Sequence, residues 1–224
     1  MREKALVCWS GGKDSALALY EAQQKQDYEI AALLTTITDR YARVSMHGVR
    51  EELLDRQCES LGIPVVKVRI AENSSEDDYR TKIAEVLARY RERGAKAVVF
   101  GDIFLEEVRN YREENLSEAG MEAVFPLWGR DTGELAETFI DLGFKAVVTC
   151  VDSEFLGQGH IGRSFDRWFL AGLPPDVDPC GENGEFHSFV YDGPPFGARV
   201  AFRKGEIVLR EERFWYCDLV LAED

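Results

Sequence analysis

Short apolar runs alternate with amphipathic stretches through the first half of the chain. The runs at residues 5–9, 33–37, 65–70 and 97–100 are mostly apolar, as expected of strands that are covered on both faces. Between them, apolar residues recur every three or four positions, which predicts amphipathic helices. Strands and helices in alternation predict right-handed β-α-β units, and therefore a parallel sheet.

Two of these helices have clear ends in the sequence. The first stops at Gly62 and Pro64, whereas the second is offered caps by Asn73 and Ser74 and ends at Gly94. Their apolar faces comprise Val49, Leu53, Leu54, Cys58 and Leu61 in the first helix, and Tyr79, Ile83, Val86, Leu87 and Tyr90 in the second.

The pattern changes in the second half of the chain. A helix over residues 135–142 and a strand over 146–149 are followed by a segment that prolines and glycines break into loops. Beyond it, we predict an antiparallel meander with a turn at residues 204–206. We therefore expect an α/β fold, with a parallel-sheet domain in residues 1–125 and a smaller C-terminal α+β domain in residues 126–224 that closes over it. The strands expected in the meander are 199–202, 207–210 and 214–221.

A polar, glycine-containing segment stands directly between the first strand and the first helix. Adjacent glycines allow a tight turn with inward N–H groups, and the helix that follows adds its positive end, so the segment is suited to an anion. The lysine adds a point charge, the serines add hydroxyl donors, and Asp14 can cap the helix or help to hold Mg²⁺. The alternative is a polar turn without a ligand, but the strand and helix on either side favour a phosphate site. The segment consists of Ser10, Gly11, Gly12, Lys13, Asp14 and Ser15.

This string resembles the pyrophosphate loop of the N-type ATP pyrophosphatases, also called the PP-loop superfamily. The resemblance implies a five-stranded parallel sheet of the adenine-nucleotide-hydrolase-like (HUP) type. It also implies cleavage of ATP between the α and β phosphates: a substrate oxygen is adenylated, pyrophosphate leaves, and a nucleophile displaces AMP. Lys13 and the loop N–H groups would stabilise the charge that builds up on the departing pyrophosphate.

Further stretches narrow the resemblance to the diphthine-ammonia ligase family, over nearly the whole chain. That family implies ATP and magnesium as cofactors, ammonia as the nitrogen donor, and the diphthine of elongation factor 2 as the acceptor. A small metabolite carboxylate as acceptor, or a module that binds ATP or AMP without turnover, stay open as alternatives. The matching stretches are residues 45–48, 61–64, 101–104, 126–129, 161–163 and 180–187.

Glu182, Glu185 and His187 form the main polar cluster outside the loop. Two carboxylates and an imidazole beside flexible glycines can bind magnesium, hold a cationic substrate or take a proton from ammonium. We expect them on the substrate side, with Glu185 joining Lys13 and Asp14 as a catalytic residue. The alternative is a solvated turn that leads into a strand.

Other candidate residues follow the predicted strands. Met46 can pack on a purine ring and His47 can reach a phosphate, unless Met46 is a core residue of the following helix. We expect Gly101 and Asp102 to contact the nucleotide, although Gly-Ala is common at these positions in the family. The substrate candidates on the next helix are Arg109 and Glu113, whose alternative is an ordinary solvated ion pair.

The same helix carries Tyr111 and Leu116, where the family tends to have an arginine and a cysteine. Nucleotide chemistry therefore transfers to this chain more directly than the identity of the acceptor.

Composition limits the classes of partner. With 224 residues and 45% hydrophobic content, the chain can bury a substantial core, and it has no apolar run long enough for a membrane span. A net charge of −14 argues against a nucleic-acid partner, because phosphates call for a basic face. Five scattered cysteines suggest no disulfide framework. The N-terminus shows no signal peptide, so we expect a cytoplasmic protein, with a homo-oligomer left open.

Overall fold

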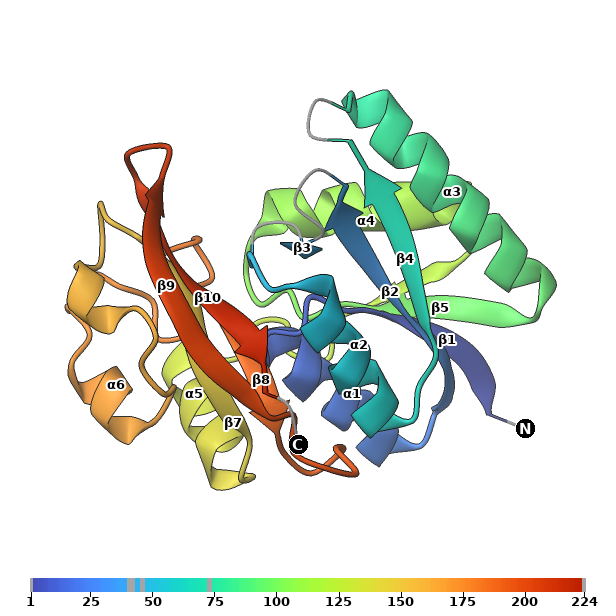
Figure 1. Cartoon of the computed structure of the whole chain (residues 1–224). Coiled ribbons are helices and arrows are strands. Elements are labelled where there is room, and N and C mark those ends of the chain that lie inside the picture. Colours follow the sequence, from blue (N-terminus) through green and yellow to red (C-terminus); the bar gives the residue numbers. More distant parts are fainter. Residues whose placement is uncertain (1, 40–42, 45–46, 72–73, 223–224) are drawn as a thin grey trace.

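The chain forms two sheets that lie side by side in a computed structural model (Figure 1). The structure describes residues 2–39, 43–44, 47–71 and 74–222. The first sheet contains five parallel strands in the order β4-β2-β1-β5-β6, and a short antiparallel strand, β3, pairs with the end of β2. The strands are β1 (Glu3–Cys8), β2 (Tyr28–Thr38), β3 (Arg43–Val44), β4 (Val65–Ile70), β5 (Ala95–Val99) and β6 (Glu122–Val124).

This sheet confirms the predicted α/β class with five parallel strands. Four of the strands coincide with the apolar runs, whereas β6, with the sequence Glu-Ala-Val, has no comparable signal. In a sheet of this kind, ligands bind beyond the carboxyl ends of the strands. Residues 10–15, which follow β1, lie at this edge of the sheet.

Helices cover both faces of the parallel sheet. Leu87 of α3 and Leu116 of α4 pack on one face, while α1 and α2 contribute to the larger core on the other face. Helix α2 ends at Gly62 as predicted, and Ser75 caps α3 one residue after the predicted Ser74. The other predicted cap, Asn73, lies outside the described residues. The helices are α1 (Lys13–Lys25), α2 (Glu51–Leu61), α3 (Glu76–Glu92) and α4 (Glu106–Glu118).

The second sheet is antiparallel, in the order β8-β7-β10-β9. Residues of both halves of the chain contribute to the larger core, and the domain division after residue 125 stays a prediction. Among the helices in the described ranges, none combines the length and the apolar character needed to cross a membrane. The elements of this half are α5 (Thr132–Asp141), β7 (Lys145–Asp152), η1 (Gln158–His160), α6 (Arg167–Ala171), β8 (Phe186–Asp192), β9 (Phe202–Arg210) and β10 (Phe214–Leu221).

The predicted turn at residues 204–206 is wrong, because β9 continues through it. Gly205 lies close to Asp218 of β10, where the pairing of the two strands shifts register. Glycine in a strand often marks such an irregularity or a close backbone approach. The hairpin turn comes later, and Arg213 N donates to Arg210 O at 3.0 Å.

An ion-pair cluster joins the hairpin to the first half of the chain. Asp218 accepts hydrogen bonds from Arg43 Nη2 at 2.8 Å, Arg50 Nε at 3.0 Å and Arg50 Nη2 at 2.7 Å. Burial acts to raise the pKa of Asp218, but the two guanidinium groups outweigh burial, and the pKa lies below its ordinary value of 3.8.

Asp218→Asn should lower the free energy of unfolding at pH 7 by about 1–3 kcal/mol, because two arginines lose a charged acceptor. A carboxylate with a depressed pKa stabilises the fold above its unfolded pKa and loses that effect as the pH falls. The difference from the parent should therefore shrink as the pH falls below 3.8. Urea unfolding of parent and variant at several pH values measures this difference in the free energy of unfolding. The exposed Asp176→Asn serves as the control, and a pH-independent difference would contradict the assignment.

Candidate active site

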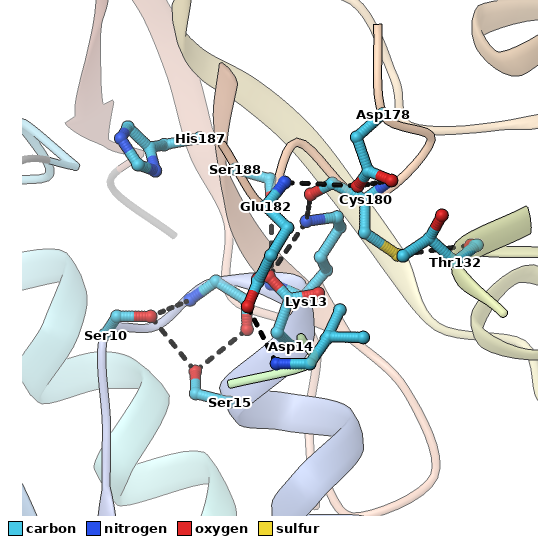
Figure 2. A network of polar contacts seen from close by, with 12 residues as sticks. Ser10, Lys13, Asp14, Ser15, Thr132, Asp178, Cys180, Glu182, His187 and Ser188 are labelled. Carbon is cyan, nitrogen blue, oxygen red and sulfur yellow. Dashed lines mark hydrogen bonds and ion pairs between the residues drawn. The ribbon is translucent and has the colours of Figure 1, made fainter. Parts of the chain in front are cut away.

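Residues 10–15, the phosphate loop, lie between the carboxyl end of β1 and the first turn of α1 (Figure 2). Ser10 Oγ accepts a hydrogen bond from Gly12 N at 3.2 Å and lies 3.2 Å from Ser15 Oγ. Ser15 Oγ donates to the Gly12 carbonyl at 2.9 Å. Gly12 itself offers no side-chain cap to α1, and of the first-turn N–H groups Lys13 N donates to Ser188 Oγ of β8. This arrangement fits an anionic group such as a phosphate.

The edge strand β8 of the second sheet lies against the phosphate loop. Val190 N donates to Gly11 O at 2.9 Å, and Lys13 N donates to Ser188 Oγ at 3.2 Å. His47 also reaches this strand, with its Nδ1 3.3 Å from Ser188 O. The loop is therefore held by both halves of the chain.

Gln57 of α2 is fully buried behind the loop and satisfies three groups at once. Its Oε1 accepts from Trp9 Nε1 at 3.2 Å, and its Nε2 donates to Gly11 O at 3.0 Å and to Val190 O. Both N–H groups of the Gln57 amide and one acceptor position of its oxygen are thus used. The sequence analysis missed Gln57, although an amide on the apolar face of an amphipathic helix was a usable signal.

Two glycines are required by close packing around the loop. A Cβ atom at Gly11, where φ is 77°, would lie 2.5 Å from Gln57 Oε1. A Cβ atom at Gly101 would lie 2.8 Å from the backbone carbonyl carbon of Asp14. Gly101 thus allows the connection after β5 to lie directly against the first turn of α1.

Lys13 is 4% exposed and points away from the loop toward the second half of the chain (Figure 2). Its Nζ lies 2.9 Å from Asp14 Oδ2 and donates to the carbonyl oxygen of Cys180. Burial acts to lower the pKa of Lys13, but the Asp14 carboxylate outweighs burial, and the pKa lies above 10.5. Lys13 is therefore a charged ammonium group at neutral pH.

Glu182 links the loop before β8 to the connection after β5. Its Oε1 accepts from Ile103 N at 2.7 Å. Burial, with the negative charges of Asp14 and Asp102 nearby, raises the pKa of Glu182 to about 7. A carboxyl group with this pKa can hold or release a proton near neutral pH.

Glu185 does not share this environment. It is 1% exposed and accepts from Asp178 N at 3.1 Å, Asn183 N at 3.0 Å and Asn183 Nδ2 at 2.9 Å. The carboxylate expected among the catalytic groups therefore binds its own loop. This geometry supports a positioning role for Glu185.

Two imidazoles meet beside the phosphate loop. The rings of His47 and His187 have centroids 4.6 Å apart, and a Cβ atom at Gly12 would lie 2.9 Å from His47 Cε1. Burial lowers the pKa of His47 to about 4, and burial together with His47 and Lys13 lowers the pKa of His187 well below 6.5. Both rings are neutral at pH 7. Met46, expected to pack on the base, lies outside the described residues.

The remaining candidates lie on or near α4. Arg109 Nε and Glu113 Oε1 form an ion pair of 2.7 Å, and the guanidinium lies 4.7 Å from the Trp128 ring centroid. Asp102 Oδ2 lies 3.6 Å from Arg112 Nε. None of the contacts found among the described residues joins Arg109 or Glu113 to the phosphate loop.

A cavity of about 50 Å³ lies at the carboxyl ends of β1, β2 and β5, between the sheet and helices α3 and α4. It adjoins a groove of about 410 Å³ between the two helices. Because its walls come from five elements, no single stretch of sequence indicates it. Its lining includes Cys8, Thr35, Thr36, Tyr79, Phe100, Tyr111 and Arg112.

The residues near the loop fit a magnesium ion that arrives with a nucleotide. Within the described ranges, no group of three or more His, Cys, Asp or Glu residues could hold a metal by itself. Mg²⁺ is commonly bound by one or two carboxylates together with substrate phosphates. Asp14, whose side chain is 30% exposed, is the carboxylate placed for this role.

Comparison with known proteins gives matches over most of the chain. The diphthamide synthase N-terminal domain matches residues 3–123, and the diphthamide synthase C-terminal domain matches residues 131–221. The diphthine–ammonia ligase of Schizosaccharomyces pombe is 25% identical over an alignment of 227 positions that covers 92% of this chain and 37% of that protein. The chain thus spans little more than a third of that relative.

Two further comparisons complete these matches. The diphthine–ammonia ligase of Bos taurus is 24% identical over 230 residues, covering 93% of this chain and 85% of that protein. Among solved structures, the U34-tRNA thiolase NcsA of Methanococcus maripaludis, determined with its 4Fe-4S cluster, is 16% identical with a TM-score of 0.39. That match covers 63% of this chain and 58% of the thiolase chain.

Gln57→Met should lower the free energy of unfolding by about 2–5 kcal/mol, because one donor and two carbonyl groups lose their buried partner. It should also weaken ATP binding, since the Gly11 carbonyl loses one of its two hydrogen-bond partners. Thermal unfolding and calorimetry measure the two effects. Gln24→Met, at an exposed position of α1, is the matched control, and a variant as stable as the parent would contradict this role.

Proposed function

The chain belongs to the diphthamide synthase family, and from this premise we propose that it is an ATP-dependent ligase. It joins ammonia to a carboxylate as an amide and releases AMP and pyrophosphate. The acceptor that the relatives suggest is diphthine, a modified histidine of elongation factor 2.

The observation that carries this proposal is the phosphate loop at the amino end of α1. Tight glycine backbone, two hydroxyl groups and a helix N-terminus converge there, and the charged Lys13 follows Gly12 directly. The β and γ phosphates of ATP bind this loop in our proposal. Since negative charge accumulates on them as the α–β bond breaks, the positive end of α1 favours departure of pyrophosphate, and Lys13 adds a positive charge nearby while its Nζ binds Asp14 and the Cys180 carbonyl.

The cavity beside the loop is the proposed site of the adenosine. Cys8, the last residue of β1, lines it, and Ser10 begins the phosphate loop two residues later. Aromatic walls from Tyr79, Phe100 and Tyr111 suit a flat base. Base and phosphates then lie across the carboxyl end of β1, as is usual for ligands of open α/β sheets.

In the first half-reaction, an oxygen of the acceptor carboxylate attacks the α phosphorus. The bond to the β phosphate breaks and an acyl-adenylate remains. Magnesium bound with ATP would neutralise phosphate charge, and Asp14 is the residue proposed to hold it. Glu185 keeps the adjacent loop in place through its bonds to residues 178 and 183.

In the second half-reaction, ammonia attacks the acyl carbon and AMP leaves. Ammonia is mostly protonated at neutral pH, so a base is required. His187 is proposed to take a proton from the attacking nitrogen as the C–N bond forms, a step that makes this nitrogen much more acidic than free ammonium, because burial beside His47 and Lys13 keeps the imidazole neutral beforehand. Glu182, with a pKa of about 7, is the second group able to exchange a proton here.

The proposal distinguishes two candidate acceptors. Tyr111 and Leu116, which depart from the family pattern, both line the proposed nucleotide cavity. A small metabolite carboxylate is the second candidate. A sensor that only binds nucleotide would share the loop but release no pyrophosphate.

ATP incubated with the enzyme, ammonium and diphthine-bearing elongation factor 2 should give AMP and pyrophosphate in equal amounts, because the loop is suited to a leaving pyrophosphate. Chromatography of labelled ATP products measures this. Lys13→Ala is the inactive control. ADP and phosphate as sole products would refute the chemistry, whereas turnover only with a small carboxylate would favour the second candidate.

His187→Gln should slow amide formation by about 100-fold or more, because it removes the proposed base for ammonium. ATP–pyrophosphate exchange, which reports adenylation alone, should remain within about threefold of the parent, since the base acts only after adenylation. His160→Gln, in η1, is the matched control. Equal loss of both half-reactions would show that His187 acts on adenylation or on folding instead.

A further inference from the structure

Two buried side-chain atoms lack a hydrogen-bond partner within the described part of the chain, Thr35 Oγ1 and Arg112 Nε. Buried polar atoms are nearly always paired, and an unpaired one costs about 1–3 kcal/mol. Both residues line the same cavity at the carboxyl ends of β1, β2 and β5. Two unpaired groups at one cavity point to a polar ligand that binds there.

Arg112 is held so that this one donor stays unused. Its guanidinium carbon lies 4.9 Å from the Phe100 ring centroid, a distance that allows a cation–π contact. Asp102 Oδ2 balances the charge, but at 3.6 Å from Nε it is too distant for a hydrogen bond. Tyr79 also interacts electrostatically with the guanidinium. The Nε–H group of Arg112 is therefore oriented and free.

The chemistry of these two atoms restricts the ligand. Arginine Nε–H is a donor only, so the ligand must present an acceptor to it, whereas the Thr35 hydroxyl can donate or accept. The aromatic lining from Tyr79, Phe100 and Tyr111 adds a preference for a flat ring. A purine with unsubstituted ring nitrogens meets these conditions.

We propose that Arg112 is a specificity-determining residue that reads the nucleotide base, with its Nε–H donating to a ring nitrogen of adenine. This inference rests on the proposed function, because that function brings ATP to the phosphate loop next to Cys8. Thr35 supplies the second polar contact to the base edge. Through Arg112, α4 would take part in recognition of the base, whereas the phosphate loop binds only the phosphates.

Calorimetry with ATP and its 1-deaza, 3-deaza and 7-deaza analogues tests the contact on the parent protein. Each analogue replaces one ring nitrogen by a C–H group. One of the three should bind about 10- to 100-fold more weakly than ATP, as expected for a lost charge-assisted hydrogen bond. The other two should stay within about threefold of ATP.

Arg112→Met completes the test as a double-mutant cycle. The variant should lose about the same factor for ATP, and it should no longer distinguish ATP from the sensitive analogue. Arg89→Met on α3 is the matched control, since Arg89 also lies over an aromatic ring, Tyr90, at 5.7 Å. Thermal unfolding of each variant verifies that it is folded.

Two results would overturn the assignment. If the parent binds all three analogues as tightly as ATP, no ring nitrogen accepts from Arg112, and this outcome does not depend on any variant folding. If Arg112→Met weakens ATP and every analogue equally while the parent discriminates, the sensitive nitrogen has another partner. A parent that binds no ATP would instead refute the proposed function.

Discussion

The contact between β8 and the phosphate loop is the constraint on which the rest of the site depends. A tight glycine loop has little regular structure of its own, so its backbone groups need partners from elsewhere. The Gly11 carbonyl obtains two of them, Val190 N from the second sheet and Gln57 Nε2 from α2. Ser188 of β8 and Ser10 of the loop itself accept hydrogen bonds from its N–H groups, so the shape of the loop is determined by two separate elements, β8 and α2.

The same packing sets the protonation of the groups around the loop. Exclusion of water disfavours charge, which keeps His47 and His187 neutral and raises the pKa of Glu182 to about 7. Lys13 keeps its charge because the Asp14 carboxylate beside it, with Glu182 nearby, outweighs the effect of burial on its pKa. One buried space thus holds a fixed cation, neutral bases and a carboxyl group able to exchange protons, which are the groups that acyl activation and amide formation need.

Sequence reasoning succeeded where the signal is local. The strand, the glycine turn and the helix around residues 10–15 are contiguous, and the periodic helices gave their ends to within a residue or two. The direction of a side chain is harder to predict: the catalytic role expected of Glu185 stays a prediction, and its carboxylate binds Asp178 and Asn183 of its own loop. Gly205 was interpreted as a turn because the register shift between β9 and β10, where two residues of β9 oppose Asp218, is not visible in the local sequence. The cavity near Arg112 was not predicted for the same reason, because its walls come from five elements.

The contact between Lys13 N and Ser188 Oγ joins residues 175 positions apart. Since synthesis proceeds from the N-terminus, the phosphate loop leaves the ribosome long before β8 exists. The parallel strands can pair during that interval, but the loop must wait for almost the last strands before its carbonyl and amide groups are satisfied. Contacts between residues this far apart in the sequence slow folding, and an apolar face stays uncovered until they form. Nucleotide affinity is therefore acquired at the end of folding, and a prematurely terminated chain retains the signature loop without the site.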